Sequence, residues 1–195
     1  MIVRCATGNP GKLREFRLAG EQSGDFSVDP LPNLRDISPP DETGDTFEAN
    51  AIQKTLYYAG HTPDWIFADD SGLEVEALGG APGVFSARYA GPGAGDAANN
   101  RLLLANLNGV SNRRAQFVCV IALAREGKLV RTFRGEVKGE MLHEARGTHG
   151  FGYDPLFYFP PFGCTFGEAG EESKMGVSHR AQALQAMFGF LRSGR

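Results

Sequence analysis

The chain has 195 residues, of which 26 are glycine, and its formal net charge is −3. A hydrophobic content of 42% excludes a disordered chain, and the lack of a Gly-X-Y period excludes collagen. A slightly acidic chain without a basic block is a poor candidate for binding nucleic-acid polymers, and its longest apolar run, residues 117–124, is too short to span a membrane.

The three cysteines, Cys5, Cys119 and Cys164, are odd in number and form no CxxC pair. This pattern predicts neither a disulfide framework nor a zinc site, and it fits a protein of the reducing cytoplasm. Cys5 and Cys119 lie in apolar runs and are predicted to be small core residues. The length predicts a single domain over residues 1–195.

The first 60 residues predict strands alternating with helices. A buried strand over residues 2–6 is followed by a turn and a helix over residues 12–19, and a short strand is predicted around residues 26–28. Asp45 and Glu48 have the spacing of a capping box, with Asp45 as N-cap, so a helix is expected to run from there to about residue 59.

The next segment predicts two strands separated by an acidic turn. The apolar residues 65–68 form the first strand, which is expected to end at Asp69-Asp70-Ser71-Gly72, and the alternating residues 73–78 form the second. Six glycines between positions 79 and 95 predict a long loop.

The second half predicts a helix over residues 96–107 and a hairpin of two strands over residues 115–124 and 129–137. A second glycine-rich stretch precedes a final helix that is expected to start at about Ser178. Strands mix with helices throughout, which predicts an α/β fold with a mixed sheet.

Four segments are candidates for chemistry. The first, Thr7-Gly8-Asn9-Pro10-Gly11-Lys12, lies between a predicted strand and a helix, where free amides and the positive helix end suit a phosphate group. It is not a Walker A loop, because that loop needs a glycine where Ala6 stands and Ser or Thr where Leu13 stands. A plain strand-to-helix turn is the alternative interpretation.

The second candidate is the pair Asp69 and Asp70. Two adjacent carboxylates beside a buried strand are costly unless a cation offsets their charge. Mg²⁺ would offset it, since this ion binds a few carboxylates together with substrate phosphate oxygens. An Asx-type turn between two strands is the alternative.

The third candidate is Phe151-Gly152-Tyr153-Asp154. Its aromatic rings, which lie between glycines, favour a stacking surface, and Asp154 could accept hydrogen bonds from a sugar or a base. The alternative is an aromatic core residue beneath a long loop.

The fourth candidate is Lys174 with His179 and Arg180. Cations in the first turn of a helix oppose its dipole, and they fit a docked anion or carbonyl oxygen. A solvated charge cluster is the alternative. Together the four describe a nucleoside triphosphate site.

In this combination, the chain resembles the inosine triphosphate pyrophosphatase family. The matching segments occur in family order over nearly the whole chain. They are residues 6–12 (ATGNPGK), 42–47 (ETG-x-TF), 68–73 (ADDSGL), 79–83 (GGAPG), 86–89 (SARY), 150–155 (GFGYDP) and, read loosely, 178–184 (SHR followed by AL).

The resemblance implies an elongated α/β fold, with a mixed sheet flanked by helices in two lobes and a central nucleotide cleft. It also implies a homodimer that uses Mg²⁺ to hydrolyse ITP, dITP and XTP to the monophosphate and pyrophosphate, which keeps these nucleotides out of DNA and RNA.

Site residues also follow from the resemblance. Asp70 would bind Mg²⁺ and serve as general base, with Glu42 as the second metal carboxylate, and Lys54 is a weaker candidate for phosphate contact. The residues expected to hold the triphosphate are Thr7, Gly8, Asn9, Pro10, Gly11 and Lys12. Ser71 would contact the substrate. The residues expected to bind the nucleotide, chiefly its base end, are Phe151, Gly152, Tyr153, Asp154, Lys174, His179 and Arg180.

One position departs from the family. The family usually reads Thr-Phe-x-Glu-Asn-Ala in the second helix, whereas this chain has Ala49 at the position of that glutamate. Glu48 lies about 100° around the helix and cannot simply substitute, so metal binding is less firmly implied than phosphate binding.

Two other functions stay open. A non-catalytic nucleotide-binding module would lack the metal carboxylates, and a pyrophosphatase for a modified pyrimidine would differ in the groups that read the base. Whether Asp69 or Asp70 takes the proton is open as well.

Overall fold

The computed structural model describes residues 1–194. By its internal contacts the chain divides into two compact units. Unit 1 comprises Met1–Asp70, Cys119–Gly135 and His179–Arg195, and unit 2 comprises Ser71–Val118 and Glu136–Ser178. The single domain over residues 1–195 and the central cleft stay predictions.

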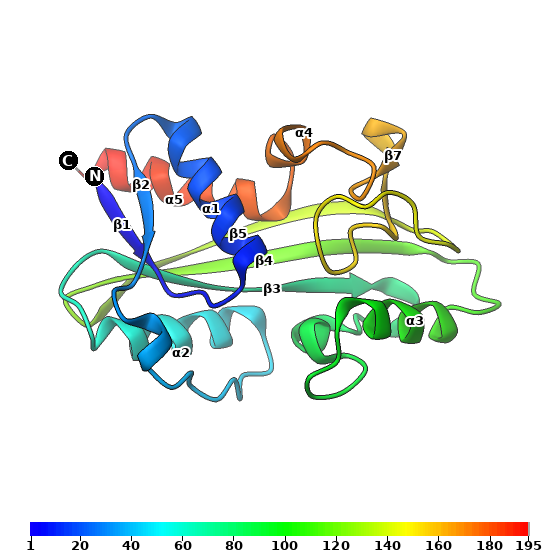
Figure 1. Ribbon diagram of the computed structural model, residues 1–195, viewed down its shortest axis with the longest axis horizontal. Helices are drawn as coiled ribbons and strands as arrows, with labels where there is room; N and C mark the ends of the chain where they lie inside the picture. The colour runs from blue at the N-terminus through cyan, green and yellow to red at the C-terminus, as the bar shows by residue number, and fades with distance from the viewer. Residues whose placement is uncertain (195) are drawn as a thin grey trace. The chain divides into compact units, whose positions relative to one another are not determined.

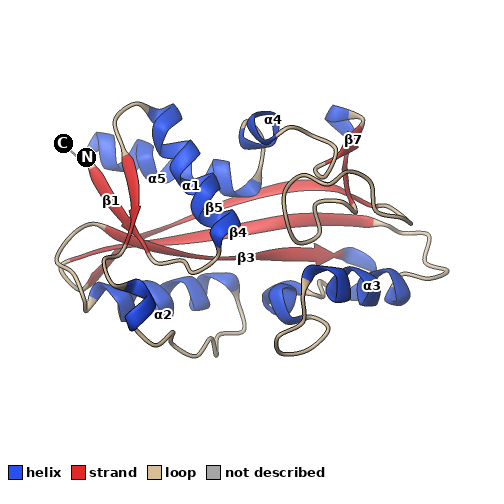
Figure 2. Cartoon of the chain, viewed as in Figure 1, coloured by secondary structure: helices blue, strands red, loops and turns tan. Residues whose placement is uncertain are grey.

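The strands form one seven-stranded sheet in the order β2-β1-β3-β4-β5-β6-β7. β1 pairs in parallel with β2 and β3, while β6 pairs antiparallel with β5 and β7, so the sheet is mixed. This confirms the predicted α/β class with a mixed sheet flanked by helices (Figure 2). The strands are β1 (Ile2–Cys5), β2 (Ser27–Pro30), β3 (Ile66–Val75), β4 (Arg114–Arg125), β5 (Lys128–Met141), β6 (Phe157–Phe159) and β7 (Cys164–Thr165).

Unit 1 places helices on both sides of its strands. α1 (Pro10–Ser23) and α5 (His179–Ser193) lie together on one side, and α2 (Phe47–Ala59) lies on the other (Figure 1). A stacked pair of rings, Phe26 and Phe188, joins the segment before β2 to α5, with ring centroids 4.7 Å apart. These contacts link the first and last segments of the chain in one packed body.

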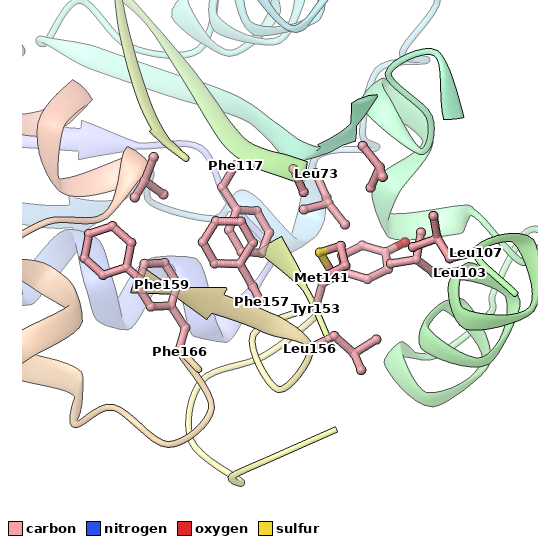
Figure 3. Close-up of a cluster of buried hydrophobic side chains, with 13 residues drawn as sticks. Leu73, Leu103, Leu107, Phe117, Met141, Tyr153, Leu156, Phe157, Phe159 and Phe166 are labelled. Carbon is pink, nitrogen blue, oxygen red and sulfur yellow. The ribbon is translucent and has the colours of Figure 1, made fainter. Parts of the chain in front are cut away.

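Unit 2 is built around an apolar cluster that includes three aromatic side chains of its short strands and the following loop (Figure 3). Phe157, Phe159 and Phe166 pack with Leu103 and Leu107 of α3 (Asp96–Asn106) and its C-terminal end. The remaining helices are short. They are α4 (Glu171–Met175) and the 3₁₀ turns η2 (Glu76–Leu78), η3 (Gly83–Arg88) and η4 (Pro160–Phe162), with η1 (Leu34–Asp36) in unit 1.

Several predictions are confirmed with small shifts. Cys5 and Cys119 are buried and free, as expected for core residues. The predicted hairpin is formed by β4 and β5, whose connecting Glu126 and Gly127 both have positive φ (51° and 73°). The predicted loop between positions 79 and 95 contains the 3₁₀ helix η3. Among the described helices, none combines the length and apolar character that crossing a membrane requires.

Two local predictions are wrong. The N-cap of α2 is Thr46 rather than Asp45, because the Thr46 hydroxyl accepts a hydrogen bond from the Ala49 amide at 3.1 Å. The acidic segment is not a turn either: β3 runs without a break from Ile66 to Val75 and carries Asp69 and Asp70 inside it. The alternative of an Asx turn is thereby excluded.

A close contact between β5 and the start of α5 gives a first testable prediction. A Cβ added at Gly135 would lie 2.1 Å from the His179 carbonyl oxygen and 2.8 Å from the Ala183 amide nitrogen. Because backbone atoms cannot yield cheaply, Gly135→Ala is expected to lower the free energy of unfolding by about 1–3 kcal/mol, as overpacking does. Urea unfolding followed by circular dichroism measures it.

The matched control is Gly189→Ala in α5. At this position the described structure leaves the space around an added Cβ open. This variant is expected to gain up to about 1 kcal/mol of stability from helix propensity. Equal losses in the two variants would contradict the contact as the cause.

Candidate functional site

The loop between β1 and α1 is organised by Asn9, the N-cap of α1. Its Oδ1 accepts hydrogen bonds from the amides of Gly11 at 2.9 Å and Lys12 at 3.1 Å. The Asn9 amide in turn donates to Thr7 Oγ1 at 3.2 Å. The expectation of free amides at this helix start is therefore wrong for Gly11 and Lys12, since the cap satisfies both. Residues 8–10 are exposed.

Asp69 lies at the centre of a buried group of charges in unit 1. The Lys12 ammonium is 2.8 Å from its Oδ2, and Arg180 Nε is 3.9 Å from the same oxygen. Burial would raise the pKa of Asp69, but the charges of Lys12, Arg180 and Lys54 together outweigh burial and hold this pKa at about 2. Asp69 is therefore a fixed negative charge at neutral pH.

Arg180 has a second carboxylate partner that sequence reasoning missed. Its Nη1 donates to Glu15 Oε2, and both side chains are only 3% exposed. Burial alone would lower the pKa of Arg180, but Glu15 and Asp69 raise it above its usual value. His179 is equally buried, so the alternative of a solvated charge cluster is wrong. Glu15 could have been noticed as a charged residue beside the buried Phe16 and one helical turn before Ala19.

Asp70, the next residue, has a different environment. Its Oδ2 accepts a hydrogen bond from Asn50 Nδ2 at 3.0 Å, and its Oδ1 lies 3.5 Å from Lys54 Nζ. Burial raises the pKa of Asp70 above its usual value, and the nearby cations offset this only in part. Two neighbouring carboxylates of one strand thus have pKa values shifted in opposite directions.

Glu42 joins the Asp70 group through Lys54. The Lys54 ammonium lies 3.1 Å from Glu42 Oε1 and 3.5 Å from Asp70 Oδ1, so both carboxylates face one cationic atom. Burial would lower the pKa of Lys54, but Asp70, Asp69 and Glu42 raise it. Within residues 1–194, no group of three or more His, Cys, Asp or Glu side chains is arranged to hold a metal. The pair still fits Mg²⁺, which takes few protein carboxylates and completes its shell with water and phosphate oxygens.

The helix position at which the chain departs from the family that it resembles is exposed. Ala49 lies on the surface of α2, and the neighbouring Glu48 accepts a hydrogen bond from Thr132 Oγ1 at 2.6 Å. Asn50, one residue further on, is fully buried and holds the Gly44 amide with Oδ1 at 2.8 Å as well as Asp70. Sequence reasoning missed Asn50, although an amide between the buried Phe47 and Ala51 of one helix face is a polar residue that needs partners.

The predicted site residues of unit 2 gather around Asp154. Its Oδ2 accepts from the Phe151 amide at 2.9 Å and lies 2.6 Å from Lys174 Nζ. The Lys174 ammonium is 5.2 Å from the centroid of the half-buried Phe151 ring, within cation–π range. Asp154 and Lys174 are both almost completely buried. The segment therefore forms a preorganised turn with one partly exposed ring.

Tyr153 differs from its neighbours. It is 4% exposed, belongs to the apolar cluster of unit 2, and donates its hydroxyl to the Ser86 carbonyl at 2.8 Å. The alternative of an aromatic core residue beneath a loop thus describes Tyr153, while Phe151 is only half-buried. Ser71 is half-buried and follows Asp70 directly in β3.

The structure therefore brings the predicted residues together in separate groups. In unit 1, Lys12, Asp69 and Arg180 form one cluster, and Glu42, Lys54 and Asp70 form another around the Lys54 ammonium. In unit 2, Phe151, Asp154 and Lys174 form a third.

Comparison with known proteins points to one family. The model of the Ham1 family matches residues 3–190. The chain is 47% identical over 187 residues to a protein of Exiguobacterium sp. named dITP/XTP pyrophosphatase, covering 96% of this chain and 95% of that relative. A Listeria monocytogenes protein of the same name is 44% identical, with 95% and 92% covered.

Solved structures agree with the sequence comparison. The Staphylococcus aureus Ham1 protein superimposes with a TM-score of 0.88 at 39% identity, with all of both chains covered. A Mycobacterium abscessus structure described as a nucleoside-triphosphatase or dITP/XTP pyrophosphatase gives a TM-score of 0.75 at 40% identity, covering 98% of this chain and 100% of that one. The resemblance inferred from the motifs is confirmed, and the chain belongs to the Ham1 family.

Proposed function

We propose that this protein is a nucleoside triphosphate pyrophosphatase that converts ITP, dITP and XTP to the monophosphate and pyrophosphate. The observation that carries the proposal is the pair of neighbouring carboxylates in β3. Asp69 is neutralised by Lys12 and Arg180, whereas Asp70 lies with Glu42 around one cationic atom. One strand thus provides both a structural anion and a reactive one, and relatives named dITP/XTP pyrophosphatase support the substrate class.

The triphosphate would be held by residues 7–12 and Lys54. Lys12 is anchored on Asp69, which orients its ammonium without removing its charge. The exposed backbone around Gly8 allows a phosphate to approach closely, because an added Cβ there would meet no atom of the described structure within 4 Å. Lys54 would turn from Glu42 and Asp70 to the phosphate oxygens once another cation neutralises these carboxylates.

Glu42 and Asp70 would hold Mg²⁺. When bound, this ion supplies Lewis-acid stabilisation of the negative charge that develops on phosphate oxygens. This chain has Ala49 where the family usually has a glutamate, so these two carboxylates are the protein ligands that we assign.

Asp70 is assigned as the general base that orients and deprotonates the attacking water. The assignment is supported by geometry: Asp70 Oδ1 lies 3.5 Å from the Lys54 ammonium, whereas Asp69 Oδ2 is tied to the Lys12 ammonium at 2.8 Å. Asp69, with a pKa of about 2, is a far weaker base. Water attacks the α-phosphorus, its bond to the bridging oxygen breaks, and pyrophosphate leaves with that electron pair.

The base end would be bound by residues 151–154, Lys174, His179 and Arg180, and Ser71 would contact the substrate. A donor from His179 or Arg180 to the 6-keto oxygen would lose its partner when adenine presents an amino group there. Leaving such a polar group unpaired lowers the kcat/KM for the wrong substrate by a factor of about 10⁴ or more in sites built for hydrogen bonding.

We further propose, from the family resemblance, that the protein is cytoplasmic and a homodimer. Sedimentation of the purified protein tests the dimer.

A pyrophosphate-release assay tests the function directly. ITP, XTP, dUTP, GTP and ATP are compared at equal concentration, with Mg²⁺ and with EDTA. We expect turnover of ITP and XTP at least about 100-fold above ATP, given a polar discrimination of this kind, and none with EDTA. Equal turnover of ITP and ATP, or preference for dUTP, would contradict the substrate class.

A further inference from the structure

The turn that carries Phe151 is hydrogen-bonded to helix α3. The Gly152 amide donates to Asp96 Oδ2 at 2.7 Å, and the Gly152 carbonyl accepts from Asn100 Nδ2 at 3.0 Å. Asp96 and Asn100 are four residues apart, so both project from the same face of α3. One residue of the turn is therefore held at both of its backbone polar groups by a single helix.

The other side of the turn is held independently. Asp154 accepts from the Phe151 amide and pairs with Lys174, which lies against the Phe151 ring. Gly150 permits this geometry, since its φ is +74° and an added Cβ would lie 2.1 Å from Asp154 Oδ2. Phe151 is thus anchored at its own amide and, through Gly152, at the peptide that follows it.

Helix α3 is itself firmly placed within unit 2. Leu103 is fully buried in the apolar cluster. Asn99 binds the glycine-rich segment before the helix: its Oδ1 accepts from the Ala90 amide at 2.8 Å, and its Nδ2 donates to the Ala87 carbonyl at 3.2 Å. The helix that binds the turn is therefore itself held by packing and by hydrogen bonds within unit 2.

We propose that Asp96 and Asn100 are positioning residues that set the orientation of the Phe151 ring and so the affinity for the nucleotide base. This inference rests on the proposed function for one element, the contact between that ring and the base. Neither residue belongs to the carboxylate groups around Asp69 and Asp70. Their removal is therefore expected to weaken binding in the ground and transition states alike, which raises KM and leaves kcat nearly unchanged.

The kinetic test uses Asp96→Ala and Asn100→Ala. A hydrogen bond of this kind corresponds to a KM increase for ITP of about 3- to 10-fold per variant, with kcat within about 2-fold of the unmodified protein. Asp96→Asn keeps an acceptor oxygen at the same distance from the backbone and is expected to restore most of the affinity. Asn106→Ala is the matched control, because Asn106 lies on the same helix and binds Tyr89 Oη instead of the turn.

A second readout does not depend on activity. Hydrogen exchange of peptides that cover residues 150–154 is expected to accelerate in Asp96→Ala, whose lost carboxylate accepts the Gly152 amide, and to stay unchanged in Asn106→Ala. Unchanged exchange in Asp96→Ala, or a loss of kcat in place of a rise in KM, would overturn the positioning role.

Failure of the proposed function has a different signature. If the unmodified protein does not hydrolyse ITP, the function is wrong, and the exchange measurement still decides whether α3 holds the turn. If ITP is hydrolysed but KM does not change in either variant, the function stands and the positioning role falls.

Discussion

Asp70→Asn is expected to lower kcat for ITP hydrolysis by about 10³-fold or more, since a general base contributes about 10²- to 10⁴-fold and the substitution also removes a metal carboxylate. The amide has the size of the carboxylate and can keep the Asn50 contact through its oxygen, so the fold is expected to persist. Pyrophosphate release measures kcat, and calorimetric titration with ITP measures binding. Binding should remain measurable, because Lys12 and residues 7–11 are untouched.

The neighbouring substitution is the control for this result. Asp69→Asn leaves Lys12 and the buried Arg180 without their shared anion, so we expect weaker ITP binding and lower stability. Retention of more than a tenth of the normal kcat in Asp70→Asn, together with loss of kcat alone in Asp69→Asn, would reverse the assignment of the base.

Glu15→Ala is expected to lower the free energy of unfolding by about 3–5 kcal/mol, the usual cost of removing one partner of a buried ion pair. Asp69 would remain as an anionic partner of Arg180, but Arg180 Nε lies 3.9 Å from Asp69 Oδ2, and the Arg180 side chain is only 3% exposed. Chemical denaturation of the purified variants measures the loss.

Two further variants separate the ion pair from a general effect on α1. Glu21→Ala changes an exposed glutamate of the same helix and is expected to alter stability by less than about 0.5 kcal/mol. The double variant Glu15→Ala with Arg180→Met removes both charges of the pair. Part of the free energy of unfolding lost in Glu15→Ala should therefore be recovered. Equal losses for Glu15→Ala and Glu21→Ala would show that the pair does not stabilise the fold.

The elements that the sequence predicted well are those decided by local pattern. The β4–β5 hairpin follows from two long apolar runs separated by a short polar turn, and α5 from apolar residues at helical spacing. Ala181, Leu184, Phe188 and Leu191 are all buried, as that spacing requires. Such patterns need no information about the rest of the chain.

The acidic segment of β3 shows where local reasoning fails. Asp-Asp-Ser-Gly has the composition of a turn, yet the strand continues through it because the carboxylates are satisfied by Lys12, Lys54, Asn50 and Arg180. These partners lie between 16 and 111 positions away in the sequence. Tertiary ion pairs and hydrogen bonds therefore override the local preference for a turn, and no local pattern reveals them.

The site was predictable in its reactive residues and less so in their supports. The motifs that resemble the family contain Lys12, Asp70 and Arg180. Asn50 also lies in a family motif, Thr-Phe-x-Glu-Asn-Ala, but had no predicted role, and Glu15 lies outside the motifs. Both are buried polar residues on apolar helix faces, and the groups that they hold are visible only in three dimensions.

The order of synthesis has a consequence for unit 1. This unit draws on three separate stretches of the chain, of which the last begins at His179. Glu15 and Asp69 therefore emerge from the ribosome long before Arg180, the cation that both contact in the folded protein. A nascent or prematurely terminated chain that lacks α5 carries these carboxylates without their guanidinium partner. We therefore expect such a chain to leave unit 1 incomplete and to be degraded by quality-control proteases.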